Sequence, residues 1–476
     1  MRDAIVVGGG PNGLTAAVVL AEAGLDVLLI EARSTIGGGS RTEELTLPGF
    51  RHDICSAIHP IGSISPVFRR IGLERHGLEW VHPTIPLAHP FDDGPPGLLL
   101  RSTAATEEAL GIDDGSWCAL MDPFVEHAAE LFDEILRPIR IPSHPFLMAR
   151  FGLQGLRSCA ALVERFGSER ARGLFAGCAA HSFLPLRAAG TASFGLVLAL
   201  TAHAIGWPLA RAGSASIMIA LERRFRELGG QIETGNRVTS LAALPASRVV
   251  LFDLTPRQVV CIAGRELPAR FAGQLDAFRY GPGVFKLDWA LDGPIPWRAP
   301  ECASAGTVHV GATFAEIARS EADASAGRIT ERPFVLVAQQ SAFDPTRAPA
   351  GKQTGWAYCH TPHGSSVDMT EHIEAQIERF APGFRDRILR RHTMSSADFE
   401  AHDGNMIGGD IGGGANDLRQ FLFRPTMRWD PYSTPNDRLY ICSSSTPPGG
   451  GVHGMCGYWG ATSALRRSFG KTLPPL

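Results

Sequence analysis

The sequence predicts an α/β protein: one domain with a parallel sheet and helices on both faces, and a second domain of mixed sheet with a helical cap. Three observations predict it. The N-terminus reads as a strand–turn–helix–strand unit, the C-terminus as a strand–glycine loop–helix unit, and the middle of the chain as a helix followed by strands. Buried apolar strands joined by helices are typical of parallel sheets covered on both faces.

The N-terminal unit begins with the apolar run at residues 4–7, which predicts a buried strand. A glycine loop and an apolar-periodic helix follow, and Gly24 marks the end of that helix. The second strand, residues 27–30, ends at Glu31, 18 residues after Gly13. This order of elements is the setting that a dinucleotide-binding glycine motif requires.

Each residue of the glycine loop has a physical role in such a site. Gly8 permits the tight turn, Gly10 leaves room for a pyrophosphate, and Gly13 lets the helix pack close to the strand. Pro11 and Asn12 complete the loop, and the helix N-terminus offers free N–H groups to the phosphates. Glu31 stands where a carboxylate accepts hydrogen bonds from a ribose. The unit therefore predicts a Rossmann-like dinucleotide-binding domain.

The residues after Glu31 indicate which dinucleotide is bound. Glu31-Ala32-Arg33 leads to Gly37-Gly38-Gly39-Ser40-Arg41-Thr42, which resembles the second glycine pair of the FAD-containing amine oxidase and phytoene desaturase superfamily. The resemblance implies that FAD contacts a set of residues here: Ala32, Arg33, Gly38, Gly39, Ser40 and Arg41.

Many members of the superfamily carry arginine directly after the glycine doublet. This chain has Gly39 there, so the resemblance transfers the phosphate contact to Arg41. The stretch GGGSRTEELTLPGFRHDICSAIHP looks more like phytoene dehydrogenase-related oxidoreductases of bacteria than like monoamine oxidases.

The C-terminus resembles the closing motif of the same superfamily. A short strand at 439–442, a turn at 443–448 and three glycines precede a helix from about Gly454. The resemblance implies that this helix points its N-terminus at the flavin, with Ser444, Gly454 and Met455 beside it. A helix N-terminus stabilises the negative charge of a reduced flavin.

The middle segment completes the predicted FAD-binding domain. A helix containing Ile217 and Phe225 precedes strands at 231–238 and 248–253. The resemblance implies that Val238 contacts the adenine end of FAD through its backbone. We therefore predict a discontinuous FAD-binding domain from residues 1–75, 205–261 and 431–476.

The remaining residues predict a substrate region in two parts. Residues 76–204 read as a helical cap and residues 262–430 as a substrate-binding domain. The apolar stretch 194–210 reads as a buried helix. Apolar and charged residues alternate over 284–291, which predicts a half-buried strand. A further strand is expected at 334–339 and a helix at 371–380.

Composition excludes several classes of protein. The 476 residues are 44% hydrophobic and carry a net charge of −3, which indicates a globular protein of two domains without a basic stripe for nucleic acid. Nine cysteines without a C-x-x-C pair argue against a disulfide framework and a dithiol flavoenzyme, and favour a reducing cytoplasm.

The sequence shows no signal peptide and no uninterrupted apolar stretch of membrane-spanning length. Peripheral membrane contact stays open, because related desaturases act on lipid-soluble substrates. No metal is expected, since no cysteine or carboxylate completes a site with His360 and His363.

Candidate catalytic residues are few, because a flavin itself accepts the hydride. The resemblance to amine oxidases favours Lys286, which would hold a water near the reactive flavin nitrogen; a lysine on the solvent face of its strand is the alternative. His59, His453, Tyr458 and Trp459 are candidates for the walls of the substrate cavity, or for packing alone.

These observations predict an FAD-dependent oxidoreductase of the phytoene desaturase branch. It would remove a hydride and a proton from a small, mostly apolar organic substrate and pass electrons to oxygen or a quinone. The alternatives are amine oxidase-type C–N oxidation, flavin-dependent isomerisation of a polyene, and a flavoprotein without catalytic activity.

Overall fold

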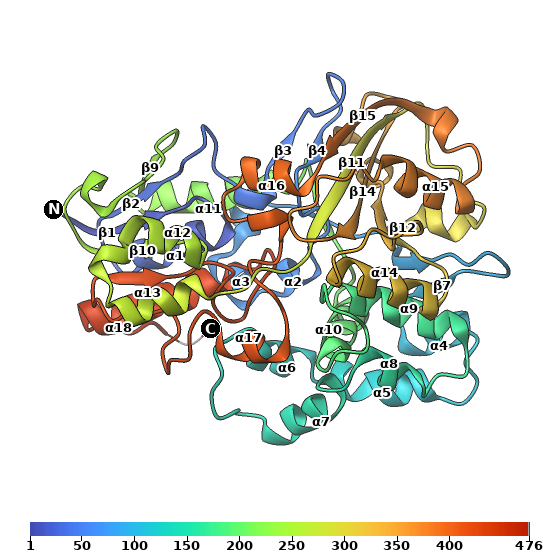
Figure 1. Cartoon of the computed structure of the whole chain (residues 1–476), viewed down its shortest axis with the longest axis horizontal. Coiled ribbons are helices and arrows are strands. Elements are labelled where there is room, and N and C mark those ends of the chain that lie inside the picture. Colours follow the sequence, from blue (N-terminus) through green and yellow to red (C-terminus); the bar gives the residue numbers. More distant parts are fainter. Residues whose placement is uncertain (475) are drawn as a thin grey trace.

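The computed structural model describes residues 1–474 and 476, and its first domain contains a five-stranded sheet. The strand order is β16–β10–β1–β2–β9, and each neighbouring pair is parallel (Figure 1). The sheet confirms the predicted α/β fold class. Its strands are β1 (Arg2–Val7), β2 (Val27–Ile30), β9 (Gln231–Glu233), β10 (Ser247–Phe252) and β16 (Leu439–Ile441).

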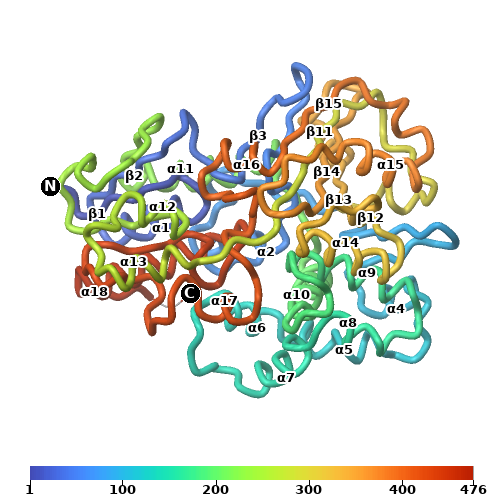
Figure 2. The backbone as a smooth tube through the Cα atoms, viewed as in Figure 1, coloured from blue at the N-terminus to red at the C-terminus, as the bar shows by residue number. Residues whose placement is uncertain are grey.

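Three separate stretches of chain build this sheet, as predicted. In Figure 2 the N-terminal, middle and C-terminal parts of the tube meet on one side of the molecule. The middle strand is shorter than expected: β9 ends at Glu233, and Val238 lies in the loop that follows.

Helices cover both faces of the sheet because successive strand residues point to opposite sides. Val6 packs in a core with α1 (Pro11–Glu22), α11 (Ala215–Glu227) and α18 (Met455–Phe469). Val7, on the other face, packs in a second core with α12 (Pro256–Ala263) and α13 (Ala269–Asp276).

Because of the helices α12 and α13, this part of the first domain ends later in the chain than predicted. We expected the chain to leave the FAD-binding domain at residue 261, but the nucleotide-side core continues through residue 276. The two helices are amphipathic. Their apolar residues Val259, Phe271 and Leu275 cover the face of the sheet opposite α1.

The second domain is built on a seven-stranded mixed sheet with the order β15–β11–β14–β13–β12–β6–β7. All neighbours are antiparallel except β6 and β12, which are parallel. The strands are β6 (Ile85–His89), β7 (Gly97–Leu99), β11 (Gly283–Leu291), β12 (Ala305–Val310), β13 (Val335–Ala338), β14 (Gln353–Thr361) and β15 (Ile388–Met394).

The predicted strand around 284–291 is present as β11, but its predicted half-burial is wrong, because all nine residues are buried. Phe285 and Leu287 pack with α15 (Thr370–Phe380) in the core of the second domain. The opposite face carries Lys286 and Asp288, which are 1% and 0% exposed. Alternation of apolar and charged residues therefore marks two buried faces, one of them ionic. The helix α14 (Phe314–Ser325) lies beside this sheet (Figure 1).

A helical cap lies next to the sheet, below it in Figure 1. Its last helix is buried, as the apolar stretch predicted. The segment 76–204 also supplies β6 and β7 to the mixed sheet, which helical periodicity did not reveal. The cap helices are α4 (Thr103–Ala109), α5 (Ser116–Val125), α6 (Ala128–Ile135), α7 (Pro145–Gly155), α8 (Cys159–Val163), α9 (Glu169–Ala180) and α10 (Thr191–Ala204).

Short elements connect these parts. They are β3 (Thr42–Glu43), β4 (His52–Asp53), β5 (Trp80–Val81), β8 (Leu209–Ala210), α2 (Pro60–Ile64), α3 (Pro66–Ile71), α16 (Ser396–His402) and α17 (Leu418–Phe423).

Candidate functional site

One large cavity, with a volume of about 780 Å³, connects the glycine loop of the first domain with the mixed sheet and the cap. Its size is that of a small-molecule or cofactor site. Its walls come from segments far apart in the sequence, including residues 7–12, 30–33, 38–41, 55–62, 134–140, 236–238, 402–406 and 443–445.

The glycine loop has the geometry that the motif predicts. Gly8 has a φ of +106°, a backbone conformation that favours glycine. A Cβ atom on Gly13 would lie 2.0 Å from the carbonyl oxygen of Gly8, so only glycine allows the helix this close to the strand. Gly10 is extended at the N-cap of α1, where a Cβ would lie 2.9 Å from Oδ2 of Asp253.

Glu31 holds the loop and the second glycine segment together. Its Oε2 accepts a hydrogen bond from the Gly9 N–H at 2.8 Å, and its Oε1 accepts one from the Arg33 N–H at 2.8 Å. Arg41 Nη2 lies 3.3 Å from Oε1 and donates to the Thr35 carbonyl oxygen at 2.8 Å. Glu31 and Arg41 both line the cavity.

Asp253 is a site residue that the sequence analysis did not single out. It follows β10, and its Oδ2 accepts a hydrogen bond from the Gly13 N–H at 2.8 Å. Burial raises the pKa of Asp253 to about 8, against the opposing effect of the Gly13 hydrogen bond. The carboxyl is therefore mostly protonated at neutral pH and adds little negative charge where phosphates would bind. Its place at the carboxyl end of a strand adjoining β1 was the available signal.

The C-terminal segment lies against the glycine loop, as predicted. Asn12 Nδ2 lies 3.4 Å from Oγ of Ser444, and both residues line the cavity together with Val238 and His453. Gly454 instead packs α18 onto α1, since a Cβ there would lie 2.4 Å from Thr15 Oγ1.

At the N-terminus of α18, one backbone N–H group already has a hydrogen-bond acceptor within the protein. The Met455 N–H donates to Nδ1 of His453 at 3.0 Å. Burial lowers the pKa of His453 to about 4, so the ring is neutral and able to accept this bond. Gly454 and Met455 are not among the described residues that border the cavity.

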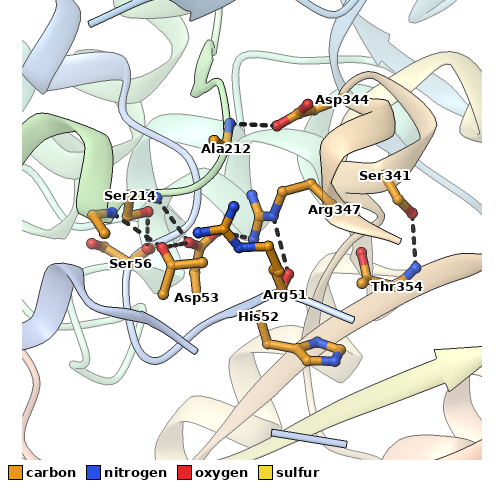
Figure 3. A network of polar contacts seen from close by, with 12 residues as sticks. Arg51, His52, Asp53, Ser56, Ala212, Ser214, Ser341, Asp344, Arg347 and Thr354 are labelled. Carbon is orange, nitrogen blue, oxygen red and sulfur yellow. Dashed lines mark hydrogen bonds and ion pairs between the residues drawn. The ribbon is translucent and has the colours of Figure 1, made fainter. Parts of the chain in front are cut away.

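His59 borders the cavity, as expected, and contacts a buried polar network. Figure 3 shows this network around Asp53, Ser214 and Arg347. Its Nε2 lies 2.8 Å from Oγ of Ser214, which donates to the Ser56 carbonyl oxygen at 2.6 Å. Asp53 accepts from the Ser214 N–H and from Arg347 Nη2, each at 2.8 Å. Burial lowers the pKa of His59 to about 4, so a neutral ring faces the cavity.

The other two predicted wall residues lie elsewhere. Within the described chain, the cavity lining does not include Tyr458 or Trp459. The guanidinium of Arg70 lies 5.8 Å from the centre of the Tyr458 ring, and Trp459 Nε1 donates to the Leu136 carbonyl oxygen at 3.0 Å. Both side chains pack α18 against its surroundings, because α18 turns this face away from the cavity.

Lys286 faces neither solvent nor the cavity. Its ammonium pairs with the Asp288 carboxylate, and both side chains are buried. His52 Nδ1 and His392 Nδ1 each lie 3.6 Å from that carboxylate. Lys286 pairs across the sheet with Tyr358, which does line the cavity. Lys286 therefore lies one strand to the side of the residues that line the cavity, on the same face of the sheet as Tyr358, and its catalytic role stays a prediction.

The cradle fits the dinucleotide that the sequence implies. A Cβ on Gly10 or Gly38 would fill the space over the N-terminus of α1, since a Gly38 Cβ would lie 3.2 Å from Gly10 Cα. Within the described residues the Asn12 Oδ1 atom is buried without a hydrogen-bond partner, at a position that borders the cavity. In the same described part of the chain, no group of three or more side chains could hold a metal ion.

Comparison with known proteins agrees with this geometry. Residues 6–71 match the family of NAD(P)-binding Rossmann-like domains. A rat (Rattus norvegicus) protein, pyridine nucleotide-disulfide oxidoreductase domain-containing protein 2, is 25% identical over 96% of this chain and 92% of its own.

Two solved structures share the whole fold. Putrescine oxidase bound to putrescine superposes with a TM-score of 0.62 and 18% identity, covering 97% of this chain and 98% of that one. Cyclohexylamine oxidase from Brevibacterium oxydans gives a TM-score of 0.58 at 15% identity, with 98% of both chains covered. The chain therefore shares the fold of these two oxidases, and residues 6–71 form the part that matches the Rossmann-like domain family.

Proposed function

We propose that this protein is an FAD-dependent oxidoreductase that desaturates a small, mostly apolar organic substrate. The observation that carries the proposal is the single cavity that runs from the glycine loop to a chamber under the cap. Most of the chamber wall is apolar or aromatic, which suits a substrate with little charge. Its apolar members include Met148, Phe151, Phe183, Phe194, Val197, Leu198 and Leu336.

In this proposal, residues of the chain bind the cofactor and orient the substrate. The N-terminus of α1 and the loop at Gly10 would hold the pyrophosphate, and Glu31 the ribose. When bound, FAD supplies the acceptor for a hydride from substrate carbon, and oxygen or a quinone then takes the two electrons. The cap and the mixed sheet keep water from the reacting carbon, and the substrate proton leaves toward the solvent side of the cavity.

Amine oxidation is the second candidate, because the solved structures with the same fold include two amine oxidases. The reaction would remove a hydride from the carbon beside nitrogen instead of forming a C=C bond. The two candidates share the cofactor and differ in the substrate.

Anaerobic mixing of the protein with candidate substrates distinguishes desaturation from amine oxidation. The purified protein is expected to carry FAD that acid precipitation releases, and an apolar alkene or cyclic ketone is expected to bleach the flavin absorbance. Bleaching by simple amines alone would establish amine oxidation in place of desaturation. Protein that folds but takes up no FAD would overturn both candidates.

We further propose that the rim of the cavity touches a membrane surface, from which an apolar substrate would enter. The loop before α7 and α7 itself border the cavity. Ile141 is 92% exposed and Phe146 90% exposed, and the exposed Arg140 and Arg150 lie beside them in sequence. In the described chain no helix is long and apolar enough to span a bilayer.

This surface gives a vesicle-binding prediction. Phe146→Asp should lower cosedimentation with phosphatidylglycerol vesicles at least tenfold, because burying one large apolar side chain is worth about 2 kcal/mol. Ile219→Asp, on an exposed position of α11, is the control and should leave vesicle binding unchanged. Equal losses in both variants, or no binding by the unmodified protein, would contradict the proposal.

A further inference from the structure

The inner end of the cavity is polar, although the rest of the chamber is mostly apolar. It is bordered by the cavity face of the mixed sheet and by His181, which follows α9. Val308 of β12 pairs with Val337 of the antiparallel strand β13, so the neighbouring Thr307 lies opposite Ala338, and Ala338 pairs with Trp356 of β14. Thr307 and Trp356 are thus two strands apart, roughly 10 Å, with only a methyl group between them.

Two residues of this face that line the cavity carry a buried polar atom without a partner in the described structure. Thr307 is 4% exposed and Trp356 6% exposed, and both residues line the cavity. Within the described residues, neither the Thr307 Oγ1 atom nor the Trp356 Nε1 atom has a hydrogen-bond partner. A buried polar group left unpaired costs about 1–3 kcal/mol, so two such groups facing one chamber indicate a place for a ligand's polar atom.

The chemistry of these groups selects the ligand atom. An indole N–H donates only, so Trp356 requires an acceptor, and the Thr307 hydroxyl can donate as well. An ammonium group has no acceptor capacity and cannot satisfy Trp356.

A carboxylate is also disfavoured at this end. His181 is the ring that borders the chamber here, and its Nε2 lies 3.3 Å from Nε2 of His309. Burial lowers the pKa of His181 to about 3, so this pair is neutral. A buried negative charge without a cation costs too much free energy to be the preferred ligand.

We infer that Thr307 and Trp356 form a subsite for a neutral oxygen atom, a carbonyl or a hydroxyl, on an otherwise apolar substrate. The inference deepens the proposed function and rests on it, because it names the class of substrate that the same cavity takes. An apolar body fills the chamber, and its oxygen lies against the sheet, which sets the orientation of the carbon skeleton.

A matched pair of probes tests the subsite by binding alone. Dissociation constants of 2-undecanone and undecane are measured for the FAD-loaded protein by equilibrium dialysis without turnover. The ketone should bind at least fivefold more tightly than the hydrocarbon. Thr307→Val and Trp356→Phe should each remove most of that difference while leaving the affinity for undecane within about twofold, since one neutral hydrogen bond contributes about 1 kcal/mol.

Thr354→Val is the control. Thr354 also lies on β14, is 1% exposed and, in the described structure, has a buried Oγ1 without a partner. It is not among the described residues that line the cavity, so its variant should keep the full preference for the ketone.

The outcomes distinguish this inference from the function on which it rests. Equal affinity for the two probes in the unmodified protein, or equal weakening of both by Thr307→Val, would overturn the subsite. If hydrocarbon alkenes reduce the flavin while 2-undecanone and undecane bind with equal affinity, the proposed desaturation would stand and only the subsite would be overturned. Absence of bound FAD would remove the proposed function instead.

Discussion

Gly10→Val is expected to abolish FAD binding. The backbone at Gly10 is extended, with a φ of −79°, so a side chain meets no backbone strain there. The obstacle is space: a Cβ would lie 2.9 Å from Oδ2 of Asp253 and 3.9 Å from Gly38 Cα, and the two methyl groups of valine would occupy the room left for phosphate. Retained flavin should fall below about one tenth of the unmodified level, which corresponds to a loss of at least ~1.4 kcal/mol in binding.

The ratio of flavin to protein absorbance measures this loss. Gly273→Val is the matched control, because Gly273 is exposed on α13 and a Cβ there meets nothing within 4 Å. Glu31→Ala should have a smaller effect, since it removes hydrogen bonds to Gly9 and Arg33 without adding a clash. Full flavin occupancy in Gly10→Val would show that the cofactor does not lie over this loop.

Lys286→Met is expected to destabilise the folded protein by about 3–5 kcal/mol, the usual cost of leaving one partner of a buried ion pair alone. Methionine keeps the length of the side chain but leaves the Asp288 carboxylate without its cation. Burial lowers the pKa of His52 to about 4 in the unmodified protein, so Lys286 is the cation that faces this carboxylate from β11 at neutral pH. Chemical denaturation measures the loss.

The pH dependence of this loss has a definite direction. Burial by itself raises the pKa of Asp288, but Lys286, His392 and His52 together lower this pKa in the unmodified protein, and Lys286 makes the largest contribution to that lowering. The unmodified protein therefore loses this contribution as pH falls through the lowered pKa. Without Lys286 the pKa of Asp288 is raised, so protonation favours the folded variant at lower pH. The difference between the two proteins should narrow on acidification.

Lys352→Met is the control for the same substitution. Lys352 pairs with Asp292 at the surface, with the two side chains 40% and 49% exposed. Such a surface pair contributes little to stability, because solvent and salt screen the two charges. An equal loss in the two variants would contradict the account of the buried pair.

The rate of flavin reduction per bound FAD tests the catalytic role of Lys286 separately. If the lysine relays a proton or holds a water for the flavin, the rate should fall at least ~10-fold, about 1.4 kcal/mol of barrier. An unchanged rate in a destabilised variant would assign Lys286 to structure alone.

Local patterns sufficed for the dinucleotide half of the protein. The apolar run at 4–7, the three glycines after it and Glu31 lie within one short segment. Their geometry depends on sterics between near neighbours, such as Gly13 against Gly8, so the sequence carries the information directly. The C-terminal strand and helix were recognisable for the same reason.

The substrate half was harder because its contacts are distant in sequence. The pairing of β6 with β12 joins residues near 85 to residues near 305, and no local pattern reveals it. Asp253 gained its role by lying beside Gly13, 240 positions away. Tyr458 and Trp459 were expected at the cavity because they follow the flavin-side segment, but the direction of a helix face depends on what packs around it.

The sequence alone determined that the chain has a Rossmann-like domain at its N-terminus, with the glycine loop and Glu31 in the order that such a domain requires. The tertiary structure decided which side chains line the cavity and which charged side chains pair with each other outside the cavity lining. Lys286 illustrates the difference. The spacing in the sequence already places Lys286 and Asp288 on one face of the predicted strand, but only the folded chain buries that face, where the two charges must be paired.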